Sequence, residues 1–166
     1  MRCFVKKNCW DCLCGKLKGK NKQPPPSAEA VTIPDWQDCT AFTPPITSGV
    51  VIKVYDGDTI TVATPLPYKT SPLYRFPVRL RAIDAPEMRA SSDVEKEAAK
   101  ASQRALSGLV LHKTVSLENI GTEKYGRVLA DVFTAEGLCV NAWMVEHRFA
   151  VPYDGGKKQP FLPDAK

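Results

Sequence analysis

The pattern of hydrophobic and polar positions begins with three predicted strands. Residues 50–55 and 59–63 are rich in β-branched residues, and the second run alternates in polarity, so both are expected to be strands. Asp56-Gly57 between them is a hairpin signal, because glycine adopts a positive φ without strain. A longer loop is expected at residues 64–73 and a third strand at 74–83.

A helix is predicted after the third strand. Ser92-Asp93-Val94-Glu95 has the capping-box pattern of a helix start, and Gly108 is the expected C-terminal stop. Apolar residues recur between them at helical spacing, which predicts one face turned towards the core. The expected stripe consists of Val94, Ala98, Ala101, Ala105 and Leu109.

Two more strands and a second helix complete the pattern. The strands are expected at residues 114–117 and 127–134, with a turn at 123–126 between them, and the helix at 140–149. Five strands with a helix between the third and fourth are the outline of an OB-type barrel. We therefore predict an α+β, mainly β domain over residues 48–166, with two helices packed on a five-stranded OB-fold barrel.

Two segments precede this domain. Residues 1–30 combine clustered Cys and Lys with a proline-rich linker, and they are expected to be a disordered basic tail. Residues 31–47 mix apolar residues with three prolines and are expected to form an irregular arm, packed on the domain by Trp36 or Phe42.

The positive charge of the chain is concentrated in the tail. Residues 1–22 hold seven Lys or Arg against one Asp, a net charge of +6, whereas the whole chain carries +5. Residues 23–166 therefore carry −1. If the domain binds nucleic acid, it does so through a few placed arginines, and long-range attraction comes from the tail.

The cysteines of the tail leave three interpretations open. They can belong to a plain flexible basic tail, carry acyl chains that attach the protein to an anionic membrane surface, or form a four-cysteine zinc site. Arg2 follows Met1, so the glycine that myristoylation needs is missing. No signal peptide or membrane-spanning run is predicted, so we expect an intracellular protein, with membrane association depending on Cys3, Cys9, Cys12 and Cys14.

Candidate chemistry is concentrated in residues 78–87. This stretch begins like a buried strand, carries two arginines, and ends in a loop with Asp84 and Glu87 on either side of Pro86. Such a set at a sheet rim suits phosphate chemistry, since arginines hold phosphoryl oxygens while a carboxylate holds a metal or takes a proton. Solvated charges on a surface loop are the alternative.

Three stretches in order resemble the staphylococcal nuclease (thermonuclease) family. They are Tyr55-Asp56-Gly57-Asp58-Thr59, residues 79–87 from Arg79 to Asp84-Ala85-Pro86-Glu87, and Glu123-Lys124-Tyr125-Gly126-Arg127. The first alone is weak, but all three in this order are specific. The resemblance covers residues 48–153.

The resemblance implies a calcium site and a set of catalytic residues. By the family pattern, Ca²⁺ is held by Asp58, Asp84 and the carbonyl of Ala85, and oxygen ligands are those that calcium prefers. Glu87 corresponds to the general base, and Arg79 and Arg127 correspond to the arginines that bind the phosphate. The resemblance also implies substrate contacts at Lys124, Tyr125 and Tyr153.

The implied activity is that of a calcium-dependent endonuclease. By resemblance it hydrolyses single-stranded DNA and RNA with little base specificity and leaves a 5′-hydroxyl and a 3′-phosphate. The alternatives are a non-catalytic nucleic-acid-binding module of the same family and a membrane-tethered adaptor that rests only on the tail. No protein partner is inferred.

Two details set expectations for the structure. Strand parity puts Arg79 and Asp84 on opposite faces, so they converge only if the strand bends or ends first, which Pro86 favours. Arg81 is the rival arginine, and the family spacing selects Arg79. The chain departs from the family in a longer loop before the third strand and in Pro160 and Pro163, which exclude the family's C-terminal helix.

Overall fold

The computed structural model describes residues 33–90 and 92–156. The contacts divide the chain into residues 1–40 and residues 41–166. In the first unit the described residues include a 3₁₀ helix, η1 (Trp36–Asp38), capped by Asp35. The expectations for residues 1–30, and those based on Pro160 and Pro163, concern residues outside the described ranges, so the proposed tail and domain boundaries stay predictions.

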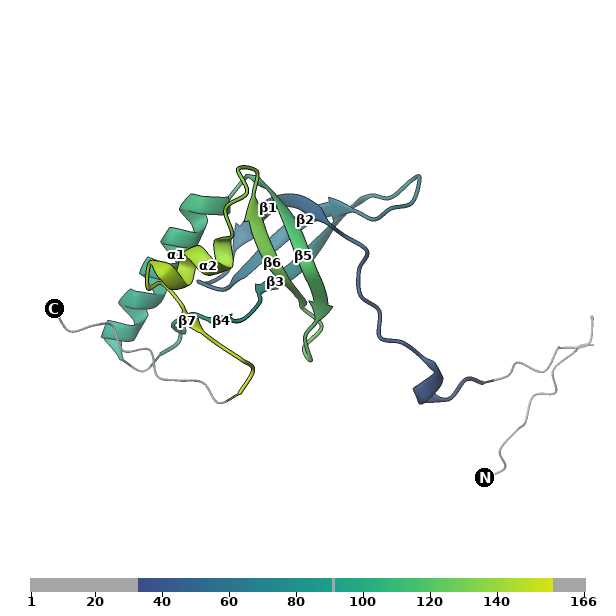
Figure 1. The fold of residues 1–166 in the computed structure, drawn as a ribbon, viewed down its shortest axis with the longest axis horizontal. Helices are drawn as coiled ribbons and strands as arrows, with labels where there is room; N and C mark the ends of the chain where they lie inside the picture. Colours follow the sequence, from purple (N-terminus) through teal and green to yellow (C-terminus); the bar gives the residue numbers. More distant parts are fainter. Residues whose placement is uncertain (1–32, 91, 157–166) are drawn as a thin grey trace, which may run out of the picture. The chain divides into compact units, whose positions relative to one another are not determined.

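The second unit contains a closed five-stranded barrel, as predicted (Figure 1). The order around the barrel is β1-β2-β3-β6-β5, and β1 pairs with both β2 and β5. All neighbours are antiparallel except β3 and β6, which run parallel. The strands are β1 (Ser48–Val54), β2 (Thr59–Pro65), β3 (Leu73–Leu80), β5 (Thr114–Thr122) and β6 (Val128–Thr134).

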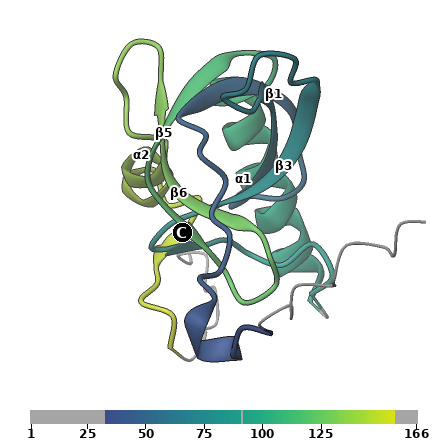
Figure 2. The ribbon, with the colours of Figure 1, turned by 90° about the vertical axis from the view of Figure 1, so that its right-hand side faces the viewer.

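Two helices and a short ribbon complete the unit. The helices α1 (Asp93–Val110) and α2 (Val140–Glu146) occupy the predicted places in the order and lie together at one end of the barrel (Figure 1). Figure 2 shows the strands curving round a common centre, with α1 on the far side. The ribbon pairs β4 (Ile83–Asp84) with β7 (Val151–Pro152). No described helix is long and apolar enough to cross a membrane.

The predicted apolar stripe of α1 is wrong by one residue. The core positions are Ala99, Ser102, Leu106 and Val110, whereas Val94 is 63% exposed and the other predicted positions are half-buried. Ser102 is polar, so the hydrophobic pattern does not include it among the core positions. It can be buried because its hydroxyl donates to the Phe149 carbonyl at 2.8 Å. Ser92 is the N-cap but makes no side-chain cap bond, and the helix continues past Gly108 to Val110, which is fully buried.

The turn between β1 and β2 needs glycine for a different reason from the predicted one. Gly57 is not among the residues with positive φ. A Cβ at this position would instead lie 1.9 Å from Ser102 Oγ and 2.7 Å from the Ala85 Cβ. The glycine therefore lets the turn approach α1 and the loop after β4, which brings Asp58 towards Asp84.

The arm is attached to the core by a residue other than those predicted. Phe42 is 70% exposed, so the packing role expected for it is wrong. Trp36 belongs to the first unit, and the packing role expected for it stays a prediction. Ile46, only 3% exposed, fills that role next to the start of β1. The Thr43 hydroxyl also lies 3.3 Å from that of Thr122 at the end of β5.

The predicted third strand is interrupted by a reversal at Arg81 and Ala82. Ala82 has a φ of +58°, in the left-handed region that non-glycine residues rarely adopt. Its carbonyl accepts the Tyr153 N–H at 2.9 Å, and the Arg81 carbonyl accepts the Asn141 amide at 2.9 Å. The other end of that amide accepts the Val132 N–H, so the buried Asn141 joins α2, β6 and the reversal.

The Gly57 contact gives a stability prediction. Gly57→Ala is expected to lower the free energy of unfolding by about 1–3 kcal/mol, because the added methyl overpacks the space against Ser102. Gly108→Ala is the matched control, since its Cβ would meet nothing within 4 Å and alanine favours a helix interior by about 0.5–1 kcal/mol. Urea unfolding followed by circular dichroism measures both changes. Equal stability of the two variants would contradict the close approach.

Candidate active site

The guanidinium of Arg79 joins two buried aspartates. Its Nη1 lies 2.7 Å from Asp58 Oδ2, and its Nη2 lies 2.9 Å from Asp84 Oδ1. Nη2 also donates to the Ile83 carbonyl at 3.2 Å. The three charged side chains are all at least 88% buried, so this cluster of one cation and two anions is well shielded from water.

Arg79 and Asp84 meet because the chain reverses between them. The predicted bend is real, but it occurs at Ala82 rather than at Pro86. Arg81 is directed elsewhere, with its Nη2 donating to the Asn119 carbonyl and its Nε buried without a hydrogen-bond partner among the described residues. The structure therefore brings Arg79, and not Arg81, to the two aspartates.

Asp58 is the carboxylate whose charge is most costly to bury. Burial, followed by the neighbouring Asp56 carboxylate, raises the pKa of Asp58 from 3.8 to about 6, although Arg79 and the Thr59 hydroxyl oppose the shift. Thr59 Oγ1 donates to Asp58 Oδ1 at 2.8 Å, and the Ala85 N–H donates to Oδ2 at 3.3 Å. On Arg79 burial acts to lower the pKa, but both aspartates outweigh it and raise the pKa, so the guanidinium stays charged.

A second arginine, Arg127, is held in place near the cluster of Arg79 with Asp58 and Asp84. Arg127 donates from Nε to Glu123 Oε2 at 2.6 Å and from Nη2 to Oε1 at 2.9 Å, and its Nη1 lies 3.3 Å from Thr59 Oγ1. The hydrogen bond from Arg127 lowers the pKa of Glu123. Glu123 opens the third family stretch, but it received no role from the sequence, although its position four residues before Arg127 was a detectable signal.

One cavity of about 450 Å³ gathers most of the predicted catalytic set. Its lining includes Asp58, Arg79, Ala85, Glu87 and Arg127. Asp84 is not part of this lining, but it is bonded to Arg79, which is. The cavity is built from the β1–β2 turn, the end of β3, the loop after β4 and the start of β6. Carboxylates and guanidiniums thus face a common space large enough for a phosphate group.

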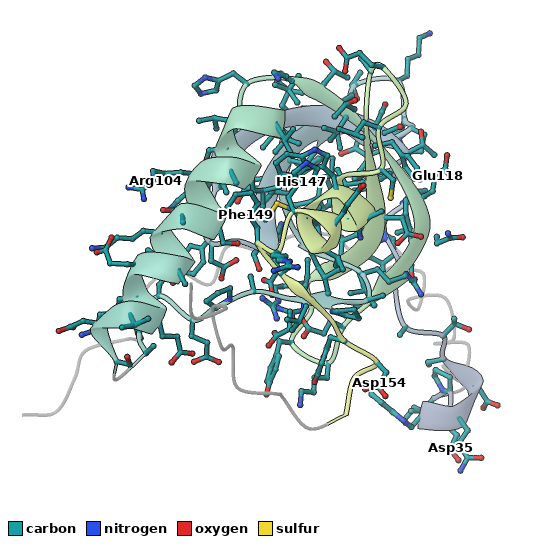
Figure 3. All side chains as sticks on the ribbon, turned by 60° about the vertical axis from the view of Figure 1, so that its left-hand side comes forward. Asp35, Arg104, Glu118, His147, Phe149 and Asp154 are labelled. Atoms are coloured by element: carbon teal, nitrogen blue, oxygen red, sulfur yellow. The ribbon has the colours of Figure 1, made fainter. Side chains whose placement is uncertain are left out.

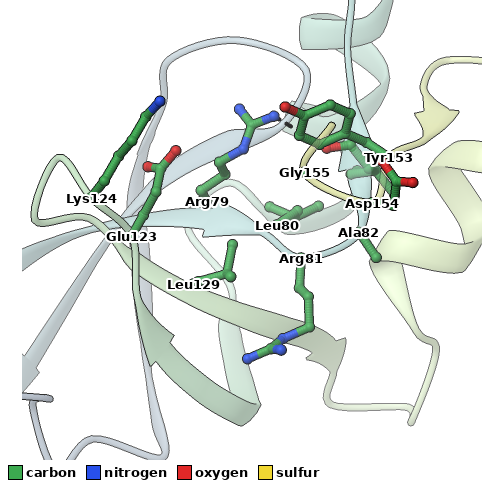
Figure 4. Close-up of a pocket in the computed structure, with 11 residues that line it drawn as sticks. Arg79, Leu80, Arg81, Ala82, Glu123, Lys124, Leu129, Tyr153, Asp154 and Gly155 are labelled. Atoms are coloured by element: carbon green, nitrogen blue, oxygen red, sulfur yellow. Dashed lines mark hydrogen bonds between the residues drawn. The ribbon is translucent and has the colours of Figure 1, made fainter. Parts of the chain in front are cut away.

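A second cavity of about 530 Å³ shares Arg79 with the first and gathers two of the predicted substrate residues. Lys124 and Tyr153 line it, and Figure 4 shows Arg79 and Arg81 extending to different sides of the chain. Tyr153 is positioned by its N–H, which donates to Ala82, and by its hydroxyl, which donates to the Gly156 carbonyl at 2.9 Å. The third predicted residue, Tyr125, lines neither of these cavities and is 72% exposed, with Lys124 Nζ 4.9 Å from its ring centre.

The donor set suits a hard cation with oxygen ligands. Within the described part of the chain, no group of three or more His, Cys, Asp or Glu is placed to hold a metal. Asp58 and Asp84 nevertheless both contact Arg79, and the backbone carbonyl of Ala85 comes directly after Asp84 in the chain. The raised pKa of Asp58 indicates that a buried negative charge lacks full compensation. Calcium accepts carboxylate and carbonyl oxygens and completes its shell with water or phosphate, so these residues fit it.

Comparison with known proteins agrees with this geometry. The model of the family described as staphylococcal nuclease homologue matches residues 77–163. An uncharacterized endonuclease of Escherichia coli is 33% identical over 117 residues, which cover 69% of this chain and 67% of the relative. An uncharacterized endonuclease of Haemophilus influenzae is 33% identical over 116 residues, covering 70% and 58% of the two chains, and the E. coli protein ParB is 32% identical over 115 residues, covering 63% and 56%. This chain therefore belongs to the staphylococcal nuclease homologue family.

Proposed function

We propose that this protein is a calcium-dependent endonuclease that hydrolyses DNA and RNA to 5′-hydroxyl and 3′-phosphate products. The observation that supports this most is the cavity that brings two arginines, Asp58 and Glu87 together. Metal-assisted phosphodiester hydrolysis needs cationic groups for the phosphoryl oxygens and a carboxylate that can accept a proton. Family membership and two relatives named as endonucleases support the same reaction.

The metal in this proposal is held by the oxygens already described. Asp58 and Asp84 would supply carboxylate ligands, and Ala85 would supply its carbonyl. When bound, calcium would supply positive charge for the phosphoryl oxygens, and it would keep Asp58 ionised.

The arginines hold the phosphoryl group in this proposal. Arg79 donates to two carboxylates, so it can exchange one of them for a phosphoryl oxygen without leaving its place. Arg127 is fixed by Glu123 through Nε and Nη2. Its Nη1 donates to Thr59 Oγ1 at 3.3 Å and has a second N–H that can bind the substrate. Two fixed guanidiniums then stabilise the charge that gathers on the five-coordinate phosphorus.

Proton transfer and substrate contacts complete the assignment. Glu87 is exposed at the cavity wall, where it can reach a water molecule and act as the general base. Lys124 and Tyr153 line the adjoining cavity, which suits a terminal phosphate and a sugar or base. Tyr125 is exposed next to Lys124 and offers a further face for stacking.

Cleavage is predicted to depend on a bound metal ion. Single-stranded DNA is expected to be cleaved in the presence of calcium and to remain intact with EDTA, because Asp58 and Asp84 with Arg79 alone keep a net negative charge that repels a phosphate. Labelling of the products with polynucleotide kinase, without phosphatase treatment, detects the expected 5′-hydroxyl ends. Equal cleavage in EDTA would contradict the metal assignment, and binding without any cleavage would identify a non-catalytic module.

The arginines are predicted to differ in their effect on kcat. Arg79→Ala or Arg127→Ala is expected to lower kcat by about 10²-fold or more, because each removes a donor to the transition state. Arg81→Ala is the matched control from the same stretch, since its guanidinium is directed towards Asn119. Single-turnover cleavage of a labelled oligonucleotide measures the three variants. An inactive Arg81→Ala beside an active Arg79→Ala would overturn the assignment.

The third prediction follows from the pKa of Asp58. Its folded value of about 6 lies above the ordinary 3.8, so the folded protein binds this proton more tightly than the unfolded chain. Without metal, the contribution of Asp58 to the free energy of unfolding therefore falls by about 2 kcal/mol as the pH rises from 4 to 7. Thermal unfolding of the wild type against Asp58→Asn isolates this contribution. Parallel pH profiles of the two proteins would contradict the raised pKa.

A further inference from the structure

The hairpin of β2 and β3 has an unusual charge distribution. Residues 59–83 contain no Asp or Glu and four Lys or Arg, although residues 23–166 as a whole carry −1. The described hairpin therefore concentrates positive charge next to the candidate site. Its basic residues are Lys69, Arg75, Arg79 and Arg81.

Strand register places part of this charge on one outer face of the barrel. Across β1, β2 and β3, Lys53 pairs with Thr61 and Thr61 with Pro77, while the next row pairs Val50 with Ala63 and Ala63 with Arg75. Directly opposite residues share a face. We call Lys53, Val50, Thr61, Ala63, Pro77 and Arg75 the basic face, in which Val50 is an exposed apolar residue.

The middle strand leaves the basic face open. Thr61 and Ala63, both half-buried, are its only contributions, and they are small. Lys53 and Arg75 are exposed on the strands to either side. The two long basic side chains are therefore separated by small side chains on β2, which leave room for a ligand between them.

The cations of this face are not held by carboxylates within the described part of the chain. Among the described residues, neither Lys53 nor Arg75 forms an ion pair, whereas Arg79, Arg127 and Lys100 all do. The nearest interaction of Lys53 is with the ring of Tyr55, whose centre lies 5.7 Å from Nζ. Unpaired cations on a rigid sheet are free to bind an external anion.

The basic face continues directly from the candidate active site. Arg75 and Arg79 lie on the same side of β3, four residues apart, which corresponds to about 13 Å along a strand. Tyr55 connects the two surfaces, because it lines the site cavity and its ring also lies below the Lys53 ammonium group. The Tyr55 side chain is 56% exposed. At a stacked spacing of about 3.4 Å, 13 Å accommodates about four nucleotides.

We propose that the basic face binds a single-stranded nucleic acid beyond the scissile phosphate, with Lys53 and Arg75 each on a phosphate of the flanking strand and a base stacked on Tyr55. This inference rests on the proposed function and extends it from the cleaved bond to the flanking strand. A single strand fits because an exposed aromatic ring takes an unpaired base, and a base inside a duplex is already stacked.

The test compares a long substrate with a minimal one. Lys53→Ala/Arg75→Ala in the full chain is expected to raise KM for a 12-nucleotide single strand at 50 mM salt by about tenfold or more, with kcat unchanged. KM for a dinucleotide with one phosphodiester should not change, since it cannot reach the basic face. The slope of log KM against log salt for the long strand should shrink by about 1.4, the value for two lost phosphate contacts.

The control is Lys100→Ala/Arg104→Ala, which removes two charges from α1, where Arg104 points outward (Figure 3). Anisotropy of a labelled 12-nucleotide strand in EDTA reads binding without cleavage, so failure of the proposed function leaves this test intact. Unchanged KM and binding in the Lys53/Arg75 variant, an equal loss in the control variant, or an equal loss for a 12-base-pair duplex would each overturn the inference.

Discussion

The shared ion pair of Arg79 with Asp58 and Asp84 is the interaction on which the site depends. It connects three segments: the β1–β2 turn, the end of β3 and β4. All three side chains are largely buried, so loss of any one would leave an unpaired charge away from water, which is far more costly than loss of a surface pair. The ion pair thus fixes the relative positions of the carboxylates, and everything that lines the cavity is placed around it.

Backbone geometry makes this ion pair possible, and the helices secure that geometry. The reversal at Ala82 turns the chain so that Asp84 faces Arg79, and Asn141 of α2 holds the reversal through the Arg81 carbonyl. On the other side, Gly57 lets the β1–β2 turn contact Ser102 of α1. Both helices therefore support the candidate site, although neither supplies a residue to its cavity. Their packing contributes to the precision of the site as well as to the core.

The sequence predicted what is local and left out what depends on distant contacts. Alternation and turn signals were sufficient for the strand and helix order, and motif spacing selected Arg79, the arginine that the structure brings to the two aspartates. The reversal at Ala82 could not be predicted, because alanine carries no turn signal and its φ is imposed by Asn141 and the Tyr153 N–H. The steric role of Gly57 and the burial of Ser102 depend on each other across 45 positions of sequence, so neither is visible in its own neighbourhood.

Charge compensation divides the protein's cations into two kinds. Arg79 and Arg127 are neutralised by carboxylates within the fold, which holds their guanidiniums in place before any substrate arrives but requires that a phosphate compete with an existing partner. Lys53 and Arg75 have no ion-pair partner among the described residues, so they can attract a phosphate at no such cost while lacking fixed orientation. Arg79 and Arg127 thus have fixed orientations, while Lys53 and Arg75 on the adjoining face can attract a phosphate. In this way a domain with a net charge near zero can present two unpaired cations beside its candidate site.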